Sequence, residues 1–136
     1  MTDRPQFDSR FLVNIEQIDR EHRQLFEIAG RVYDGLSDSD ATAIAVARKA
    51  IAELIEYTAT HFANEEALMR AARYPDMETH RAQHHQLLLQ ARDMEMRAEI
   101  DEQYVPLELN RFIANWLAEH ITASDRKFGE FVVAGK

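Results

Sequence analysis

Histidines on the apolar faces of long helical patterns are the feature that most constrains the fold of this 136-residue chain. Of its six histidines, five lie in phase with the apolar residues around them: His22, His61, His80, His84 and His120. An imidazole buried among apolar side chains is costly unless it finds a hydrogen-bond or metal partner. The fold therefore has to bring these five rings to a shared polar partner.

Four segments carry apolar residues at three- and four-residue spacing, which predicts amphipathic helices over about 19–36, 41–72, 77–100 and 106–128. Residues 1–18 form an N-terminal arm. Asp19 is a candidate cap for the first helix, Pro75 follows the end of the second, and Pro106 begins the fourth. Short connections predict an all-α protein: an antiparallel, up-down-up-down four-helix bundle with an N-terminal arm, a single domain over residues 1–136.

Composition excludes several classes of function. The chain has no cysteine, so disulfides, thiolate zinc sites, iron–sulfur clusters and cysteine nucleophiles are ruled out. A net charge of −8 disfavours nucleic acid and anionic membranes as partners. The sequence contains neither a secretory signal nor an apolar run of membrane-spanning length, which predicts a cytoplasmic protein with no membrane partner.

The positions of the five histidines place them at one end of the predicted bundle. His22 lies near the start of the first helix, and His80 and His84 lie near the start of the third. His61 and His120 lie near the ends of the second and fourth. Because neighbouring helices run antiparallel, these starts and ends meet.

Two carboxylates accompany the histidines. Glu65 follows His61 by four residues, so both side chains project from the same helical face. Asp125 follows His120 by five residues, and on a regular helix such residues diverge by about 140°. We therefore expect the helix to widen or fray between His120 and Asp125, as a π-type turn would allow, so that both side chains reach the same end of the bundle.

Five imidazoles and two carboxylates in an apolar interior point to a pair of metal ions. Imidazole binds late first-row metals well, and a carboxylate can bridge two of them. We consider two octahedral metals that share both carboxylates and a bridging oxygen. With the five histidines as the remaining ligands, one coordination position of the pair would stay open. Iron, manganese, cobalt and zinc are all compatible with these ligand types.

The ligand spacing is similar to that of a known family. It reads His22, then His61-Phe-Ala-Asn-Glu65, then His80-Arg-Ala-Gln-His84, then His120-Ile-Thr-Ala-Ser-Asp125. Over essentially its whole length the chain resembles the bacterial hemerythrins, whose signature is H, HxxxE, HxxxH and HxxxxD in this order.

The resemblance implies a non-haem centre of two iron ions, bridged by an oxo or hydroxo group, that binds dioxygen reversibly and needs no catalytic base. Carried over position by position, one iron would be held by His80, His84 and His120, the other by His22 and His61, and both would be bridged by Glu65 and Asp125. The second iron would keep the open position.

Three residues depart from the usual bacterial pattern. Tryptophan usually stands at the position of Phe7, glycine at that of Asn14 and glutamine at that of Glu21. None is a ligand. Glu21, like Glu66 and His85, is out of phase with the ligand face, and we expect all three to face solvent. If Glu21 pointed inward instead, it would add an acidic group near the iron with the open position.

Other residues lie within one helical turn of the ligands and are expected to line a ligand pocket or simply to pack in the core: Phe26, Thr58, Phe62, Leu88, Trp116, Leu117 and Ile121. Thr58 is the polar member of this set. We expect its hydroxyl to bond its own helix backbone rather than a bound ligand.

Three functions remain open at this point. Reversible dioxygen binding for carriage, storage or scavenging is favoured, because di-iron enzymes generally use more carboxylates and fewer histidines. A di-iron oxidase, peroxidase or nitric-oxide reductase is the enzymatic alternative. A sensory module is the third, and the sequence leaves open a homo-oligomer or a separate protein partner.

Overall fold

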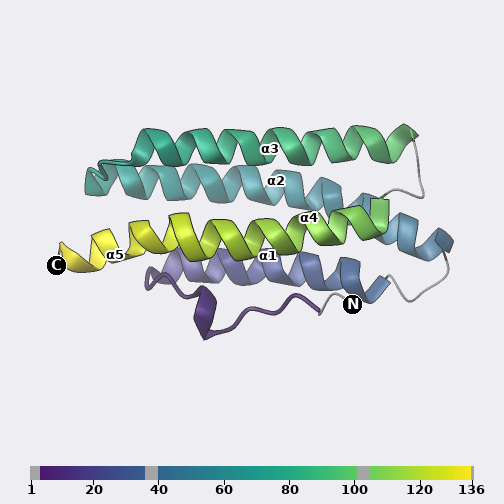
Figure 1. Cartoon of the computed structure of the whole chain (residues 1–136), viewed down its shortest axis with the longest axis horizontal. Helices are drawn as coiled ribbons and strands as arrows, with labels where there is room; N and C mark the ends of the chain where they lie inside the picture. Colours follow the sequence, from purple (N-terminus) through teal and green to yellow (C-terminus); the bar gives the residue numbers. More distant parts are fainter. Residues whose placement is uncertain (1–3, 36–39, 101–104, 136) are drawn as a thin grey trace.

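The computed structural model of the chain is an antiparallel four-helix bundle with up-down-up-down connections, as the sequence predicts (Figure 1). The structure describes residues 4–35, 40–100 and 105–135. In these ranges the elements are η1 (Ser9–Phe11), α1 (Glu16–Gly35), α2 (Asp40–Ala72), α3 (Met77–Ile100), α4 (Val105–Glu119), η2 (His120–Asp125) and α5 (Arg126–Ala134). The last three follow one another without a break and together form the fourth rod of the bundle. No helix in the described ranges combines the length and the apolar character of a membrane span.

The first helix begins three residues earlier than predicted, at Glu16. Asp19 is not its cap. Its carboxylate reaches back from the first turn and accepts hydrogen bonds from the backbone N–H of Val13, at 2.8 Å, and of Asn14, at 3.2 Å. Asn14 has a φ of 66°, a left-handed conformation that glycine adopts freely and asparagine tolerates. The side chain that was expected to start the helix therefore fastens the arm to it.

The end of α2 is set by local backbone chemistry. The helix α2 ends at Ala72, as predicted, where Arg73 takes a φ of 56° and the Tyr74 N–H donates to the Met69 carbonyl at 2.9 Å. This Schellman-type ending satisfies a carbonyl of the last turn. The predicted fourth helix ended too early: the fourth rod continues beyond residue 128 to Ala134.

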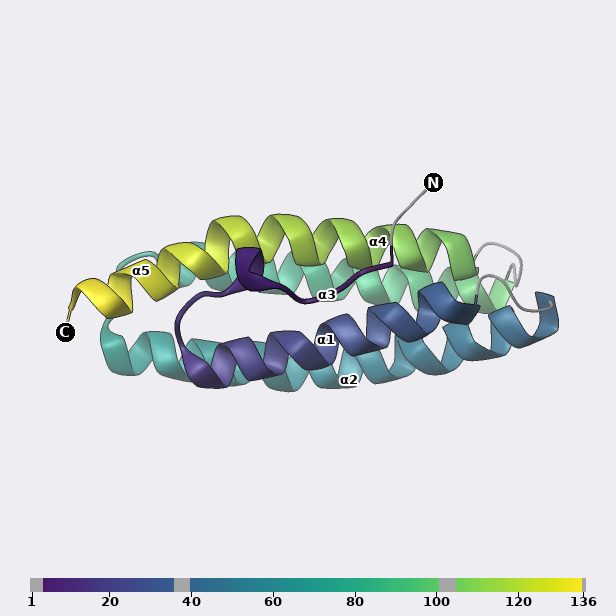
Figure 2. The ribbon, with the colours of Figure 1, turned by 90° about the horizontal axis from the view of Figure 1, so that it is seen from below.

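The arm closes one side of the bundle. Figure 2 shows it lying over the seam between α1 and the fourth rod. The ring of Phe11 lies 4.7 Å from that of Phe26, and Phe7 meets the same ring edge-on at 5.7 Å. Phe11 and Val13 of the arm are buried in the main apolar cluster together with Ile18 of α1. The arm is thus part of the core that surrounds the ligand end of the bundle.

A close backbone contact seats the arm on α5. A Cβ added at Gly129 would overlap the Val13 carbonyl oxygen, and backbone cannot move away as a side chain can. At Gly30, by contrast, an added Cβ would meet only the flexible end of Arg4, at 2.6 Å. Gly129 is therefore required by packing, whereas Gly30 is not.

We predict that Gly129→Ala lowers the free energy of unfolding by about 1–3 kcal/mol, the usual range for an overpacked core. Gly30→Ala is the matched control. It should be neutral or stabilising by up to about 1 kcal/mol, because alanine has the higher helix propensity. Urea unfolding of both variants followed by circular dichroism measures this, and equal effects of the two substitutions would contradict it.

Asn110 belongs to α4, and its side chain is fully buried in the bundle. Neither its amide nitrogen nor its amide oxygen has a hydrogen-bond partner within the described part of the chain. A buried polar group without a partner destabilises the native state by about 1–3 kcal/mol. We therefore expect Asn110→Leu, similar in size, to raise the midpoint of thermal unfolding, and a lowered midpoint would show that the amide is satisfied in solution.

Candidate metal centre

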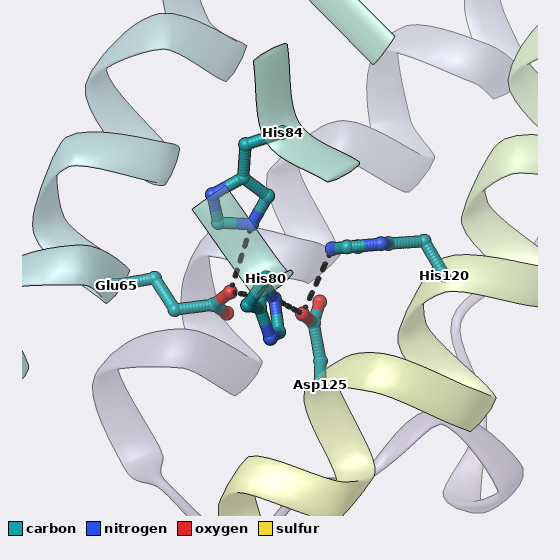
Figure 3. Close-up of side chains that lie close together, drawn as sticks. All are labelled: Glu65, His80, His84, His120 and Asp125. Carbon is teal, nitrogen blue, oxygen red and sulfur yellow. Dashed lines mark hydrogen bonds and ion pairs between the residues drawn. The ribbon is translucent and has the colours of Figure 1, made fainter. Parts of the chain in front are cut away.

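All seven predicted ligands come together at one end of the bundle, and each is at most 8% exposed. They come from four rods: His22 from α1, His61 and Glu65 from α2, His80 and His84 from α3, and His120 and Asp125 from η2. Figure 3 shows five of them, with the three imidazole rings arranged around the two carboxylates. The expectation that the helix starts and ends would meet at this depth is confirmed.

The predicted irregularity in the fourth rod is also present. The six residues from His120 to Asp125 form a π-helical turn between two α-helices. The wider turn reduces the divergence between residues five apart. As a result the His120 Nε2 atom lies 3.0 Å from the Asp125 Oδ1 atom. A regular helix would have turned one of these side chains away.

Three histidines form the first ligand group with the carboxylates. Glu65 Oε1 lies 2.8 Å from the Nε2 of His80 and 3.1 Å from the Nε2 of His84. Asp125 Oδ1 lies 2.8 Å from His80 Nε2, besides its contact with His120. The potential ligand atoms of these five residues all lie within 4.8 Å of one another.

Two histidines form the second ligand group with the same carboxylates. The Nε2 of His22 lies 2.9 Å from Asp125 Oδ2, and the Nε2 of His61 lies 3.9 Å from Glu65 Oε2. Each carboxylate therefore offers one oxygen to the three-histidine group and the other to the two-histidine group. That is the arrangement a bridging carboxylate requires.

Several of these ring nitrogens and carboxylate oxygens lie close to a possible partner without forming a hydrogen bond. Buried atoms that lack a hydrogen bond in the described residues include both ring nitrogens of His22, His120 Nε2, Glu65 Oε2 and Asp125 Oδ2. His22 Nε2 and Asp125 Oδ2 are only 2.9 Å apart, so it is direction and not distance that prevents the bond. Lone pairs that converge on a common point suit a cation, which would remove the cost of these unpaired buried groups. The donor set, imidazole nitrogen and carboxylate oxygen, fits a pair of late first-row metal ions.

The electrostatics of the cluster favour charged forms. Burial lowers the pKa of His80, but hydrogen bonds to Asp125 and Glu65 outweigh it and raise the pKa to about 9. Burial likewise raises the pKa of Asp125, yet the charge of His120 and the close approach of the His120, His22 and His80 rings to its oxygens hold that pKa well below the ordinary value. In the metal-free protein a proton on His80 thus substitutes for part of the metal's charge.

Two carboxylates outside the ligand groups contradict the expectation that they face solvent; we call Glu21 and Glu66 the outer carboxylates. Glu21 Oε1 accepts a hydrogen bond from His61 Nδ1 at 2.7 Å, and the Glu21 side chain is only 12% exposed. Glu66 Oε2 lies 2.9 Å from His84 Nδ1. Each of these side chains is one residue out of phase with the face that carries the predicted ligands, and it points toward the adjacent helix rather than toward water. The signal in the sequence was an acidic residue directly beside a predicted ligand.

The expectation for Thr58 is also wrong. Thr60 and Thr122 donate their hydroxyls to backbone carbonyls of the preceding turn, at Glu56 and Ala118. The Thr58 hydroxyl is buried, yet it has no hydrogen-bond partner among the described residues. His85, in contrast, is exposed, as predicted.

Aromatic rings cover the ligands on the side toward the bundle interior. Phe62 stacks on His84 with ring centroids 3.7 Å apart and an interplanar angle of 5°. Trp116 meets Phe62 edge-on at 5.9 Å. Both residues belong to the set expected around the ligands, whereas the side chain of Leu117 lies outside the described residues. The rings keep the ligand end of the bundle apolar and shield it from water.

A helical bundle in which every rod contributes histidines around two shared carboxylates is a protein built to hold a pair of metal ions. The sequence matches the family described as the hemerythrin HHE cation binding domain over residues 13–132, and the chain belongs to this family.

Individual relatives agree with this assignment. The chain is 32% identical to a bacteriohemerythrin of Clostridium acetobutylicum, covering 87% of this chain and 93% of the relative. It is 27% identical to a bacteriohemerythrin of Methylococcus capsulatus, covering 89% and 90%, and 30% identical to myohemerythrin-1 of Phascolopsis gouldii, covering 90% and 89%. A crystal structure of wild-type hemerythrin superposes with a TM-score of 0.79 at 26% identity, covering 97% of both chains.

The raised pKa of His80 predicts how the metal-free protein responds to pH. The ordinary pKa of this imidazole is 6.5, so folding stabilises its protonated form. The contribution to the free energy of unfolding is fully present below about pH 6.5 and is lost as the pH rises through about 9. We expect the melting temperature of the metal-free protein to fall over this interval.

The metal-loaded protein is the control for this pH effect. A metal ligand has to be a neutral imidazole, so ligation removes the proton on which the effect depends. The fall should therefore be weaker once metal is bound, and His85→Ala should leave it unchanged. A metal-free melting temperature that is constant or rises from pH 6.5 to 9 would contradict the assignment.

Proposed function

We propose that this protein binds dioxygen reversibly at a pair of non-haem iron ions held at the ligand end of the bundle. The observation that supports this most directly is that both carboxylates belong to both ligand groups. Such sharing is needed for two ions held side by side and has no use for one ion alone.

The proposed ligands follow from the two groups. One iron would be held by His80, His84 and His120 and the other by His22 and His61, and Glu65 and Asp125 would be shared between them. The two-histidine position has one protein ligand fewer, so it is the position that can accept an external molecule. A small ligand such as dioxygen suits a site this deeply buried.

The surroundings favour reversible binding over consumption of dioxygen. When bound, the iron pair supplies the electrons that dioxygen accepts and returns. The protein supplies five neutral nitrogen ligands and few charged ones, whereas di-iron enzymes of bundle proteins generally use four carboxylates and two histidines. The Phe62 and Trp116 rings limit the access of water to the ligands. We infer a binding protein rather than an enzyme.

The finer role follows from the same inference. A protein that releases its dioxygen unchanged serves to carry, store or scavenge it, and we propose a role of this kind. The cytoplasmic location, the homo-oligomer and the separate protein partner stay predictions of the sequence.

The test is iron content together with the absorption spectrum through a cycle of reduction and re-exposure to air. We expect about two irons per chain and a charge-transfer spectrum that returns with dioxygen and fades when dioxygen is removed. Two irons with irreversible oxidation would point to a sensor or an enzyme instead. Little or no iron would remove the proposed function.

Two histidine variants sharpen this test. His61→Ala removes a proposed ligand of the two-histidine position and should abolish reversible dioxygen binding and reduce the iron content. His85→Ala removes an exposed histidine of α3 and should behave as the unmodified protein. Equal iron loss in both variants would mean that iron is held nonspecifically by histidines.

A further inference from the structure

The outer carboxylate Glu21 is held in a small hydrogen-bond network between α1 and α2. Its Oε1 atom accepts from His61 Nδ1 at 2.7 Å. Its Oε2 atom accepts from the side-chain amides of Asn64, at 2.9 Å, and of Gln17, at 3.1 Å. Both oxygens are therefore occupied, and the carboxylate cannot turn without breaking bonds to two helices.

This network determines which His61 nitrogen carries the proton. A carboxylate accepts but does not donate, so Nδ1 has to be the protonated nitrogen. In the neutral ring that leaves the lone pair on Nε2, which is the nitrogen on the side of Glu65. The second nitrogen of a metal-binding histidine commonly donates in this way, and the partner fixes both the tautomer and the ring orientation.

The other outer carboxylate, Glu66, acts on a histidine of the three-histidine group, but in different electrostatic surroundings. Besides His84 it meets the guanidinium of Arg81, with Nε at 3.3 Å from Oε1. The further partners of Glu21 are neutral amides, and no lysine or arginine of the described residues forms an ion pair with it. The negative charge behind His61 is thus uncompensated, whereas the one behind His84 is partly neutralised.

We propose that Glu21, braced by Gln17 and Asn64, is a positioning residue that holds the His61 ring with its proton on Nδ1 and its Nε2 turned toward the two-histidine metal position. It thereby sets how firmly this position keeps its ion. The proposal rests on the proposed function in so far as the ion is iron. The two-histidine position has fewer protein ligands, so it depends more on each of them than the three-histidine position does.

The first measurement needs no metal. Long-range ¹H–¹⁵N spectra of the metal-free protein at a pH where His61 is neutral identify the protonated nitrogen of each histidine. We expect His61 to be protonated on Nδ1 in the unmodified protein and to become a mixture of tautomers in Glu21→Ala. A His61 ring protonated mainly on Nε2 in the unmodified protein would overturn the proposal.

The second measurement is the removal of Fe²⁺ from the loaded, reduced protein by a chelator under anaerobic conditions. In Glu21→Ala we expect one of the two irons to be released 10–100-fold more readily, the usual effect of losing such a partner, while the other is retained as in the unmodified protein. Glu21→Gln keeps an oxygen acceptor for Nδ1 and should lie between the two. Release of both irons at equally increased rates would indicate a general loss of structure and would overturn the proposal.

Two matched variants separate position from charge. Glu66→Ala should loosen the iron of the three-histidine group instead, so that the half-loaded forms of the two variants differ in their Mössbauer spectra. Glu27→Gln removes an exposed carboxylate from the same helix as Glu21 and should change neither iron. If Glu21→Ala and Glu27→Gln both behave as the unmodified protein, the proposal fails although the proposed function stands.

Failure of the proposed function has a different signature. If the unmodified protein takes up no iron, the release experiment has no iron to report on and the function is rejected. The tautomer of His61 in the metal-free protein then decides alone whether Glu21 positions this ring. Circular dichroism of each variant excludes unfolding as the cause, and Glu21→Gln, which keeps the size and an acceptor of the original side chain, remains informative if Glu21→Ala does not fold.

Discussion

The burial of five imidazoles and two carboxylates in an apolar bundle is the constraint on which the rest of the structure depends. Each group would destabilise the fold if it stood alone in the interior. They are tolerable because they meet, and they meet only if every rod presents its polar residues at the same depth. The helix lengths, the position of each turn and the alternation of direction are therefore tied to one another through a single cluster at one end of the molecule.

A regular helix cannot meet this constraint on the fourth rod, and the chain departs from regularity at that place. The π-helical turn η2 brings His120 and Asp125 to the same side, so one rod supplies both a histidine of the three-histidine group and a carboxylate shared by the two groups. The arm encloses the same end of the bundle along the seam between α1 and the fourth rod. Asp19 fastens it to the start of α1, and the bare backbone of Gly129 lets it lie flat against α5. The ligand end is thereby enclosed by segments from both ends of the described chain.

Local and periodic signals made much of this predictable from the sequence. The bundle follows from apolar spacing, the meeting of the histidines from their positions along antiparallel helices, and the irregularity of the fourth rod from a five-residue interval. Most of the features that were not predicted depend on the direction in which a side chain points around its helix axis. Glu21 and Glu66 lie one residue from a ligand, and sequence phase alone could not tell a face turned to water from one turned to the adjacent helix. The sequence does not reveal the surroundings of the Thr58 side chain, and these determine whether its hydroxyl bonds a backbone carbonyl. The start of α1 was misplaced because Asp19 bonds backward to the arm.

The contact of Val13 with Gly129 and that of His22 with Asp125 join residues more than a hundred positions apart. Closing such long loops is entropically unfavourable and is repaid only after nearby segments have ordered. Hairpins of consecutive helices need no such closure and can form early. His22, His61 and Glu65 lie on the hairpin of α1 and α2, whereas the other four residues of the cluster lie on the hairpin of α3 and the fourth rod. Each shared carboxylate reaches from its own hairpin to the other, Asp125 to His22 and Glu65 to His80. Each hairpin can therefore order its own histidines locally, and the contacts that join the two histidine groups form only when the two hairpins dock.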